Sequence, residues 1–280
     1  MTRMLLRVLS DNYLTRFIPV PMLILFLLLS LQEPAVGQDT PVFGHPEPPS
    51  MEMVSSVRER FRYNVRYGFL NLGEVEVFVT PDTVYRGRPV IHLRTVMKSN
   101  PRIPLVGRRE VHYQSFSGIT EHWPYSYLFW RDDVESEVPE RYLIEFDRLL
   151  GEVRFFEEGA PKDTLDLEDP ASGGDVIFIY SRTFAGSDSS YELPVYIEDE
   201  KGVVKASNSP NRETRDYDAF PEPIETYRSD GTADIDGPFG FTGEFTAWFA
   251  TDELRIPLEV HTRIIFGNVR VRLVEYERLP

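Results

Sequence analysis

The chain has 280 residues, of which 41% are hydrophobic, enough for one domain with a large apolar core, and its formal charge is −15. It contains no cysteine, which excludes disulfides, thiolate metal sites, cysteine nucleophiles and a lipid anchor on an N-terminal cysteine. The acidic charge disfavours nucleic acid as a partner and is accounted for by solubility.

Residues 1–37 have the layout of a signal peptide. Basic residues come first, an apolar run fills 17–31, and two small residues, Ala35 and Gly37, stand two positions apart behind it. These are the three parts of a secretory signal. The run is interrupted by prolines and is shorter than the roughly 20 residues of a membrane span. We therefore expect cleavage after Gly37, a periplasmic or secreted product and no stable membrane anchor afterwards; an uncleaved anchor is the alternative.

The next stretch, 38–54, holds four prolines among polar residues. This composition is typical of an extended, solvated segment that joins no core. The prediction is a disordered, proline-rich linker over 38–54, followed by a single β domain over 55–280.

From Phe61 onward, apolar and polar residues alternate. Successive side chains of a strand point to opposite faces, so each alternating run predicts a strand with one dry face. The runs are 61–67, 75–79, 91–98, 109–116, 123–131, 142–147, 153–155, 191–197, 242–250, 255–265 and 268–276. Turn signals separate them at intervals typical of antiparallel folds. The predicted fold is all-β with one short helix. Its antiparallel sheet is strongly curved into a barrel or half barrel, because flat sheets of this size are unusual.

The segment 175–184 breaks the period of two. Asp175 follows a glycine-containing loop and could cap a short helix, and the apolar residues behind it recur at helical spacing. A strand remains open here, because β-branched residues are frequent. Asp175 and Arg182 could form a buried pair or bind an anion, although packing and capping are the simpler roles.

Three stretches together resemble a known family. The residues that carry the resemblance are the opening strand pair, 61–75, and seven later positions: Asp175, Tyr180, Arg182, Trp248, Asp252, Pro257 and Gly267. Their order and spacing over about residues 55–278 are similar to the bacterial family called domain of unknown function 3108. The resemblance implies an exported, mostly β protein of unassigned activity, with no catalytic residues to carry over. The end motif is also similar to that of the periplasmic lipoprotein-carrier fold, a half barrel that cups acyl chains, but fold alone does not determine function.

The most unusual local feature is an aromatic cluster. Trp123, Tyr125, Tyr127 and Phe129 alternate along one predicted strand, so we expect them to share one face. That face could line a cavity for an apolar ligand, since such pockets are rich in aromatic residues. Alternatively, the rings fill the core of the barrel.

No catalytic, metal or cofactor site is predicted. His112 and His122 could lie on neighbouring strands but lack a carboxylate at a diagnostic spacing. The stretch 234–237 departs from the calcium-loop pattern and is explained by a turn. Paired carboxylates such as Asp132 and Asp133 arise by chance in a chain with 45 acidic residues.

The first functional hypothesis is a non-enzymatic binding or scaffold protein of the cell envelope whose curved sheet cups a lipid or other apolar ligand. One alternative is a carboxylate-dependent hydrolase that acts on envelope glycan or lipid. Another is a structural partner of an envelope protein complex, bound through a sheet edge. An apolar cavity would support the ligand-binding hypothesis. Two carboxylates that converge in a polar cleft would support the hydrolase, and an exposed, unpaired sheet edge would support the structural partner.

Overall fold

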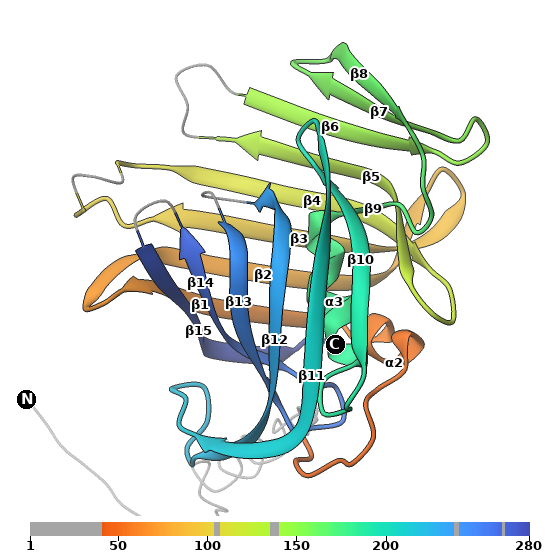
Figure 1. The fold of residues 1–280 in the computed structure, drawn as a ribbon. Coiled ribbons are helices and arrows are strands. Elements are labelled where there is room, and N and C mark those ends of the chain that lie inside the picture. The colour runs from red at the N-terminus through yellow and green to blue at the C-terminus, as the bar shows by residue number, and fades with distance from the viewer. Residues whose placement is uncertain (1–40, 104–106, 135–139, 238–240, 265–266) are drawn as a thin grey trace, which may run out of the picture. The chain divides into compact units, whose positions relative to one another are not determined.

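Fifteen strands form one sheet in the computed structural model, which describes residues 41–103, 107–134, 140–237, 241–264 and 267–280 (Figure 1). The strands are β1 (Glu59–Tyr67), β2 (Leu70–Tyr85), β3 (Arg88–Ser99), β4 (Glu110–Ile119), β5 (Pro124–Asp133), β6 (Glu140–Asp147), β7 (Glu152–Glu157), β8 (Ala160–Asp166), β9 (Ser172–Gly173), β10 (Ser190–Ile197), β11 (Glu200–Arg215), β12 (Ile224–Gly237), β13 (Phe241–Ala250), β14 (Pro257–Ile264) and β15 (Gly267–Arg278). The helical elements are α2 (Met51–Ser56), η1 (Gly174–Val176), α3 (Ile177–Tyr180) and η2 (Ser181–Thr183). The predicted all-β class with one short helical segment is confirmed.

The sheet order is β8-β7-β6-β5-β4-β3-β2-β1-β15-β14-β13-β12-β11-β10-β9. Strands that follow one another in the chain are therefore neighbours, except β8 and β9, which lie at the two ends of the order, and β1 pairs with β15 in the middle of the sheet. Of the described pairs, all are antiparallel except β9 with β10. These short connections are typical of antiparallel architectures.

The sheet curls until its β9 end meets β5. Ser126 N donates to the carbonyl oxygen of Ala171 at 3.1 Å, Gly173 N donates to Ser126 Oγ at 2.9 Å, and Ser172 Oγ donates to Pro124 O at 3.0 Å. Strands β6, β7 and β8 continue beyond this junction (Figure 1). The result is barrel-like without a continuous closing ladder, which agrees with the predicted barrel or half barrel.

The core lies inside the curl. Along β10, Tyr191, Leu193 and Val195 are buried and alternate with exposed Ser190 and Glu192, so the period of two read from the sequence is confirmed. Fully burying one such side chain contributes about 1.5–3 kcal/mol. Because the polar side of each strand stays outside, the inner face supplies the apolar core.

The helical segment of η1, α3 and η2, residues 174–183, packs within the curl between β1–β3 and β10–β12 (Figure 1). A helix of this length is not stable by itself in water. Val176 and Ile179 are fully buried against apolar residues of both halves of the sheet, so the tertiary core stabilises the segment.

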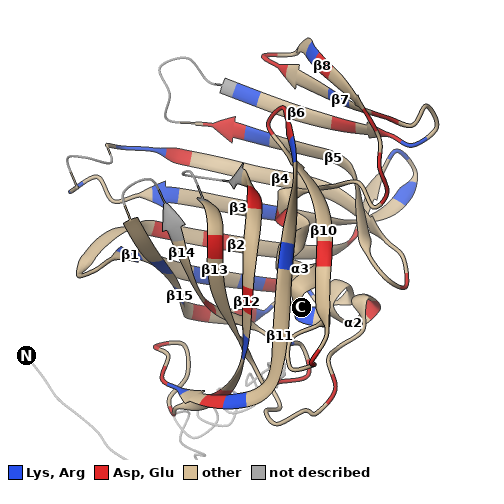
Figure 2. Cartoon of the chain, in the orientation of Figure 1, with Lys and Arg blue, Asp and Glu red and all other residues tan. Residues whose placement is uncertain are grey.

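The outer faces of the strands carry acidic and basic residues intermixed on the face drawn in Figure 2. Several form ion pairs across neighbouring strands. Arg60 contacts Glu76 at 2.6 Å, and Arg62 Nε donates to Glu275 at 2.7 Å. Such half-exposed pairs contribute little individually, about 0–1 kcal/mol. None of the helices within the described residues is long and apolar enough to cross a bilayer.

Residues 42–47 are exposed and form no helix or strand, but the prediction of a solvated linker over 38–54 is wrong for residues 49–54. Ser50 caps helix α2 by accepting a hydrogen bond from Met53 N at 3.1 Å, and Met51 and Val54 of that helix are buried in the core. His45 N donates to Thr251 O at 2.8 Å. The described residues all belong to one compact unit, Asp39–Pro280. Residues 38–40 and the predicted signal peptide, 1–37, lie outside the described residues.

Arg255 ties this N-terminal segment to the sheet. Its side chain is fully buried and donates to the carbonyl oxygens of Ala185 at 3.0 Å, His45 at 2.9 Å and Glu47 at 2.9 Å, and also to that of Asp252. The guanidinium presents five donors in a fixed geometry, which suits several carbonyl groups at once. Arg255 also has a positive φ of 51°, a conformation that glycine adopts more readily.

We expect Arg255→Ala and Arg255→Gly both to release residues 41–50 and to lower the free energy of unfolding by about 1–3 kcal/mol, because buried carbonyl groups lose their donors. Glycine relieves the positive φ, so a loss shared by both variants belongs to the guanidinium. Hydrogen exchange of the backbone amides of 41–50 and urea denaturation measure the effect. Arg212→Ala, at a partly exposed ion pair with Glu225, is the control. Unchanged protection of 41–50 in both variants would contradict this role.

Candidate ligand cavity

A cavity of about 300 Å³ lies inside the curl of the sheet. This volume is at the lower end of small-molecule sites, which span roughly 300–1,000 Å³. Its walls come from β1–β5, the helical segment and β10–β15, and they are almost entirely apolar. Apolar lining residues from these walls include Val77, Met97, Phe129, Ile177, Val195 and Ile235.

The cavity has a local cause on β12. Ser229 and Ala233 line it, and Gly231 lies between them along the strand. A Cβ at Gly231 would come within 2.3 Å of Lys205 O and 2.4 Å of the Phe245 ring, so no side chain fits there. Protein interiors are normally close-packed. Small residues along one inner strand, opposite the helical segment, therefore leave space that larger residues would fill.

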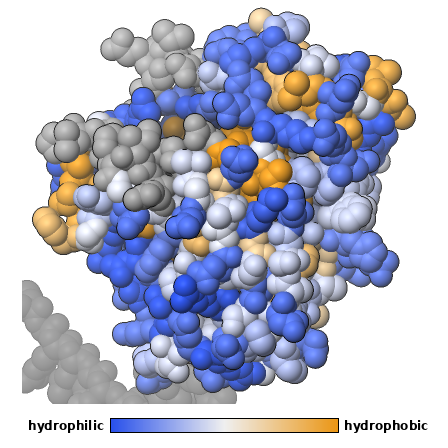
Figure 3. Space-filling view, in the orientation of Figure 1, coloured by the Kyte–Doolittle hydropathy of each residue, from blue (hydrophilic) through white to orange (hydrophobic). Residues whose placement is uncertain are grey.

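On the face shown in Figure 3, hydrophilic residues cover most of the described surface, and apolar residues gather in the middle, beside the upper ends of β11 and β12. The apolar character of the interior thus reaches the surface on one side of the sheet. Smaller apolar patches lie elsewhere on this face, and Phe69, Leu149 and Leu150 are exposed.

Asp175 is the unusual group in this cavity. It lines the wall, both carboxylate oxygens are shielded from solvent, and neither has a hydrogen-bonding partner within the described structure. Burial raises the pKa of the Asp175 carboxyl to about 7, against smaller opposite effects of the nearby Ser115 hydroxyl and the backbone N–H groups of Asp175 and Val176. Buried polar groups normally have partners, so the unpartnered carboxyl inside an apolar cavity makes Asp175 a candidate functional group.

A row of buried serines holds the loop that precedes Asp175. Ser115 Oγ lies 3.3 Å from Ser117 Oγ, which lies 3.1 Å from Ser126 Oγ, and Ser126 Oγ accepts the hydrogen bond from Gly173 N. All three serines are fully buried. They connect β4, β5 and β9, so the backbone that leads into Asp175 is held in place.

Gly173 brings this loop close to the wall. A Cβ at Gly173 would meet the Phe129 ring at 2.6 Å and Asp175 Oδ1 at 3.0 Å. A larger residue would therefore push the loop away from β5. The expected helix cap differs in detail: the N-cap of η1 is Gly173, with no side-chain cap, and Asp175 lies in the first turn of η1 with its carboxyl unpartnered.

The aromatic cluster is divided between the two sides of β5. Phe129 is buried and lines the cavity, while Tyr125 and Tyr127 are partly exposed, with their hydroxyl oxygens 3.1 Å apart. Trp123 precedes the strand and is 40% exposed.

The expectation that these four residues share one face is wrong. The register between β4 and β5 shifts between Phe116 and Ser117, opposite Tyr127, so Tyr127 is an extra residue in a β-bulge. One extra residue reverses the alternation beyond it. Ligand binding by the cluster stays a prediction, and Phe129 is its member at the cavity.

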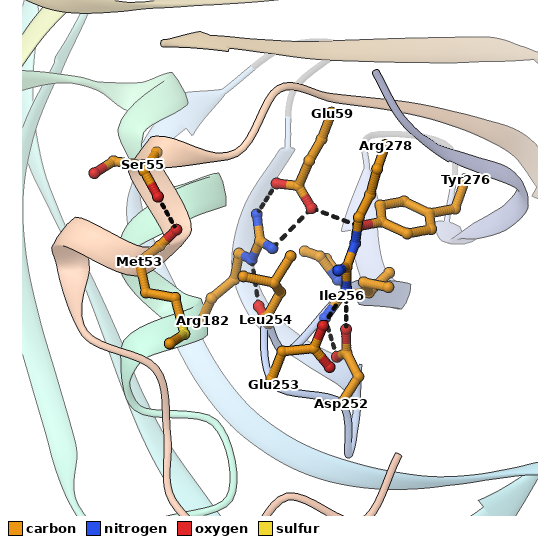
Figure 4. A network of polar contacts seen from close by, with 12 residues as sticks. Met53, Ser55, Glu59, Arg182, Asp252, Glu253, Leu254, Ile256, Tyr276 and Arg278 are labelled. Carbon is orange, nitrogen blue, oxygen red and sulfur yellow. Dashed lines mark hydrogen bonds and ion pairs between the residues drawn. The ribbon is translucent and has the colours of Figure 1, made fainter. Parts of the chain in front are cut away.

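Arg182 pairs with Glu59 and not with Asp175. Both side chains are fully buried, with Arg182 Nη1 and Nη2 at 2.7 and 3.1 Å from the two Glu59 oxygens and Nε donating to Leu254 O at 2.7 Å. Tyr276 donates its hydroxyl to Glu59 at 2.9 Å. Figure 4 shows Glu59 held between Arg182 and Tyr276, and Arg278 beyond them against Glu253.

Asp252 belongs to the same network (Figure 4). Its Oδ1 accepts from Ile256 N at 2.9 Å, which closes the turn before β14, while Oδ2 has no hydrogen-bonding partner in the described part of the chain. Burial raises the pKa of this carboxyl to about 6. The predicted motif of Arg182 and Asp252 thus joins the helical segment to the sheet, as a structural network outside the cavity.

The remaining motif residues have packing roles. The Tyr180 ring packs 5.0 Å from that of Phe184 and 5.3 Å from that of Tyr191. The guanidinium of Arg215 lies over the Trp248 side chain, 4.1 Å from the centroid of the indole ring.

Two motif positions act through the backbone. Pro257 accepts a hydrogen bond from the Tyr63 hydroxyl at 2.8 Å. Gly267 has φ 121°, and a Cβ there would meet the Tyr67 ring at 2.9 Å, so glycine is required.

Asp132 and His112, two of the residues considered for catalysis or metal binding, have polar side-chain partners. Asp132 pairs with Arg141 at 2.5 Å, and His112 Nε2 lies 2.8 Å from a Glu110 oxygen. Within the described ranges, no three histidine, aspartate or glutamate side chains gather as metal ligands would.

Sequence reasoning missed Glu59 and the small residues of β12 that line the cavity. Glu59 is in phase with Phe61 and Tyr63, the inward residues of β1, so a charge at that position was a detectable signal of a buried partner. The cavity gave a weaker signal, because the small residues of β12 are common in strands and turns.

The chain matches no protein-family model and no curated protein. Among solved structures it is similar to the crystal structure of a beta-barrel-like protein of domain of unknown function DUF1849 from Brucella abortus, with a TM-score of 0.50 and 12% sequence identity over 80% of this chain and 99% of that one. At this identity the likeness shows the fold. It also corrects the resemblance to domain of unknown function 3108, because this structural neighbour carries the name of a different domain of unknown function and no family model matches.

Proposed function

We propose that this β-barrel-like protein is a non-enzymatic binding protein that holds one apolar ligand in its internal cavity. The observation that carries the proposal is the apolar cavity of about 300 Å³ with the unpartnered carboxyl of Asp175 in its wall. The arrangement of residues 1–37 further supports action after export, in the periplasm or outside the cell.

The energetics of the interior favour a ligand. Empty apolar space destabilises a protein by on the order of 20 cal/mol per Å³, because wall atoms lose their packing partners. An apolar molecule that fills the cavity restores these contacts. Ser229 and Ala233 of β12 line the space with small side chains, so the sequence of this strand contributes to leaving it unfilled.

The other two hypotheses have less support. The edge strand β8 carries Pro161, Lys162 and Asp163, the kinds of residue with which natural sheets discourage pairing at an edge. Asp132, one of the paired carboxylates, forms an ion pair with Arg141 at 2.5 Å, and Glu157 forms one with Lys162 at 3.1 Å. We therefore favour a ligand-binding function over a role as an edge-bound partner in a complex or as a hydrolase.

Filling the cavity tests the function. We expect Ala233→Phe and Ala247→Phe to abolish ligand binding while the fold is retained, because both alanines are buried and line the cavity. Native mass spectrometry of the exported protein, followed by organic extraction, would show a lipid-sized adduct in the parent chain and its loss in both variants.

Thr232→Phe is the matched control, since Thr232 is exposed beside Ala233 on the same strand. This variant should keep the adduct. A clean unliganded mass for the parent chain, with no adduct after single-chain lipids are added, would exclude the proposed function.

A further inference from the structure

We infer that the ligand is a single-chain amphiphile with a protonated amine as its head group, and that the amine binds Asp175 inside the cavity. This inference rests on the proposed function and names the chemistry of the ligand. It excludes fatty acids and phosphate-headed lipids as preferred ligands.

The first argument is the charge of the cavity wall. Its described lining includes two charged residues, Asp175 and Glu259, and no lysine, arginine or histidine. Glu259 already has partners, with Arg215 at 2.7 Å and His261 at 2.8 Å. A carboxylate or phosphate head would therefore meet Asp175 with no positive group to balance it, and burying an unbalanced charge is costly.

The second argument is the hydrogen bonding of Asp175. An ionised carboxylate only accepts hydrogen bonds, and both of its oxygens lack a partner in the described structure. A protonated amine supplies three donors and the opposite charge. Hydrogen bonds between charged groups are shorter and stronger than those between neutral groups, so an amine gains more here than an alcohol of the same length.

The third argument is the fixed position of the carboxyl. Gly173 holds the loop against the Phe129 ring, and the buried serine row anchors the backbone just before Asp175. The carboxyl therefore lies in the wall near the junction of β4, β5 and β9, with both oxygens shielded from solvent. An amine bound there leaves the apolar chain to lie along the remainder of the cavity, beside Val195 and Ile235.

The net charge of −15 acts in the same direction, because an acidic protein attracts cations and repels anions at long range. This field favours approach of an amine-headed ligand over that of an acid with the same chain.

The test compares three ligands that share one twelve-carbon chain: dodecylamine, dodecanol and dodecanoate. Affinities for the exported protein are measured by calorimetric titration below the aggregation concentration of each ligand, about one unit above the pKa of about 7 of Asp175. We expect dodecylamine to bind about tenfold more tightly than dodecanoate, with dodecanol between them.

In Asp175→Asn we expect dodecylamine to lose about tenfold in affinity and dodecanol to change by less than about threefold. Asp252→Asn is the control, since Asp252 is also buried and has an unpartnered oxygen but does not line the cavity. The order of the three ligand affinities should be the same in Asp252→Asn as in the parent chain.

The outcomes separate the two proposals. Dodecanoate binding as tightly as dodecylamine in the parent chain, a result that needs no variant, would overturn the amine assignment and leave the cavity function standing. Unchanged dodecylamine affinity in a folded Asp175→Asn protein would do the same. No binding of any of the three ligands to the parent chain would overturn both.

Discussion

Asp175→Asn should raise the free energy of unfolding by about 2–4 kcal/mol above neutral pH, where the replaced carboxylate is ionised and buried. Burial raises the pKa of Asp175 to about 7 in the folded protein, from an ordinary value of 3.8. Between these two pH values the folded state keeps a proton that the unfolded state has released. Stability therefore falls as pH rises through this window, and the full penalty is present above the folded pKa. Asparagine has the same shape without the charge.

Urea denaturation of the parent chain and Asp175→Asn, at several pH values between 3.8 and about 7, measures this effect. The two stability curves should be close at the acidic end and diverge by about 1.4 kcal/mol per pH unit at most. Asp163→Asn, on the exposed edge strand β8, is the control. Its curve of unfolding free energy against pH should run parallel to that of the parent chain. Parallel curves for Asp175→Asn as well would show that Asp175 is not buried as a charged group.

A gain in stability at a site that we assign to ligand binding has a functional meaning. Functional groups are often retained at a cost in stability, and removing them commonly stabilises the protein. A bound amine would relieve the same penalty, so the ligand should stabilise the parent chain more than the Asp175→Asn variant.

Arg182→Met is expected to lower the free energy of unfolding by about 3–5 kcal/mol, because it leaves Glu59 as an uncompensated buried charge. Both partners are fully buried, so solvent cannot screen or replace the missing charge. Glu59→Gln should cost a similar amount for the converse reason. Thermal or urea denaturation measures both, with circular dichroism to confirm that the variants fold.

The double variant Arg182→Met with Glu59→Met separates charge from packing. It removes both buried charges, so it should cost less than the sum of the two single changes. Lys205→Ala is the surface control, because Lys205 and its partner Glu192 are both more than half exposed and such pairs contribute about 0–1 kcal/mol. A loss below about 1 kcal/mol in Arg182→Met would contradict a stabilising role for this network.

The sequence by itself determined the class of structure. Alternation of apolar and polar residues is a local property of each strand, and the pleat converts it directly into an inner and an outer face. The runs at 61–67 and 191–197 therefore became β1 and β10, with Phe61, Tyr63, Tyr191, Leu193 and Val195 buried and Tyr67 exposed at the end of β1. Helical spacing after Asp175 was likewise a local signal, and the segment 174–183 is helical.

Only the tertiary structure decided which groups meet. Arg182 and Glu59 are 123 residues apart, and no local pattern links them. A single bulge at Tyr127 reversed the faces of β5, because register depends on the neighbouring strand and not on the strand's own sequence. The cavity beside Asp175 arose in the same way, from small residues of β12 brought opposite a helical segment by the curl of the whole sheet. Alternation is fixed within one strand, whereas pairing, register and unfilled space depend on contacts between distant parts of the chain.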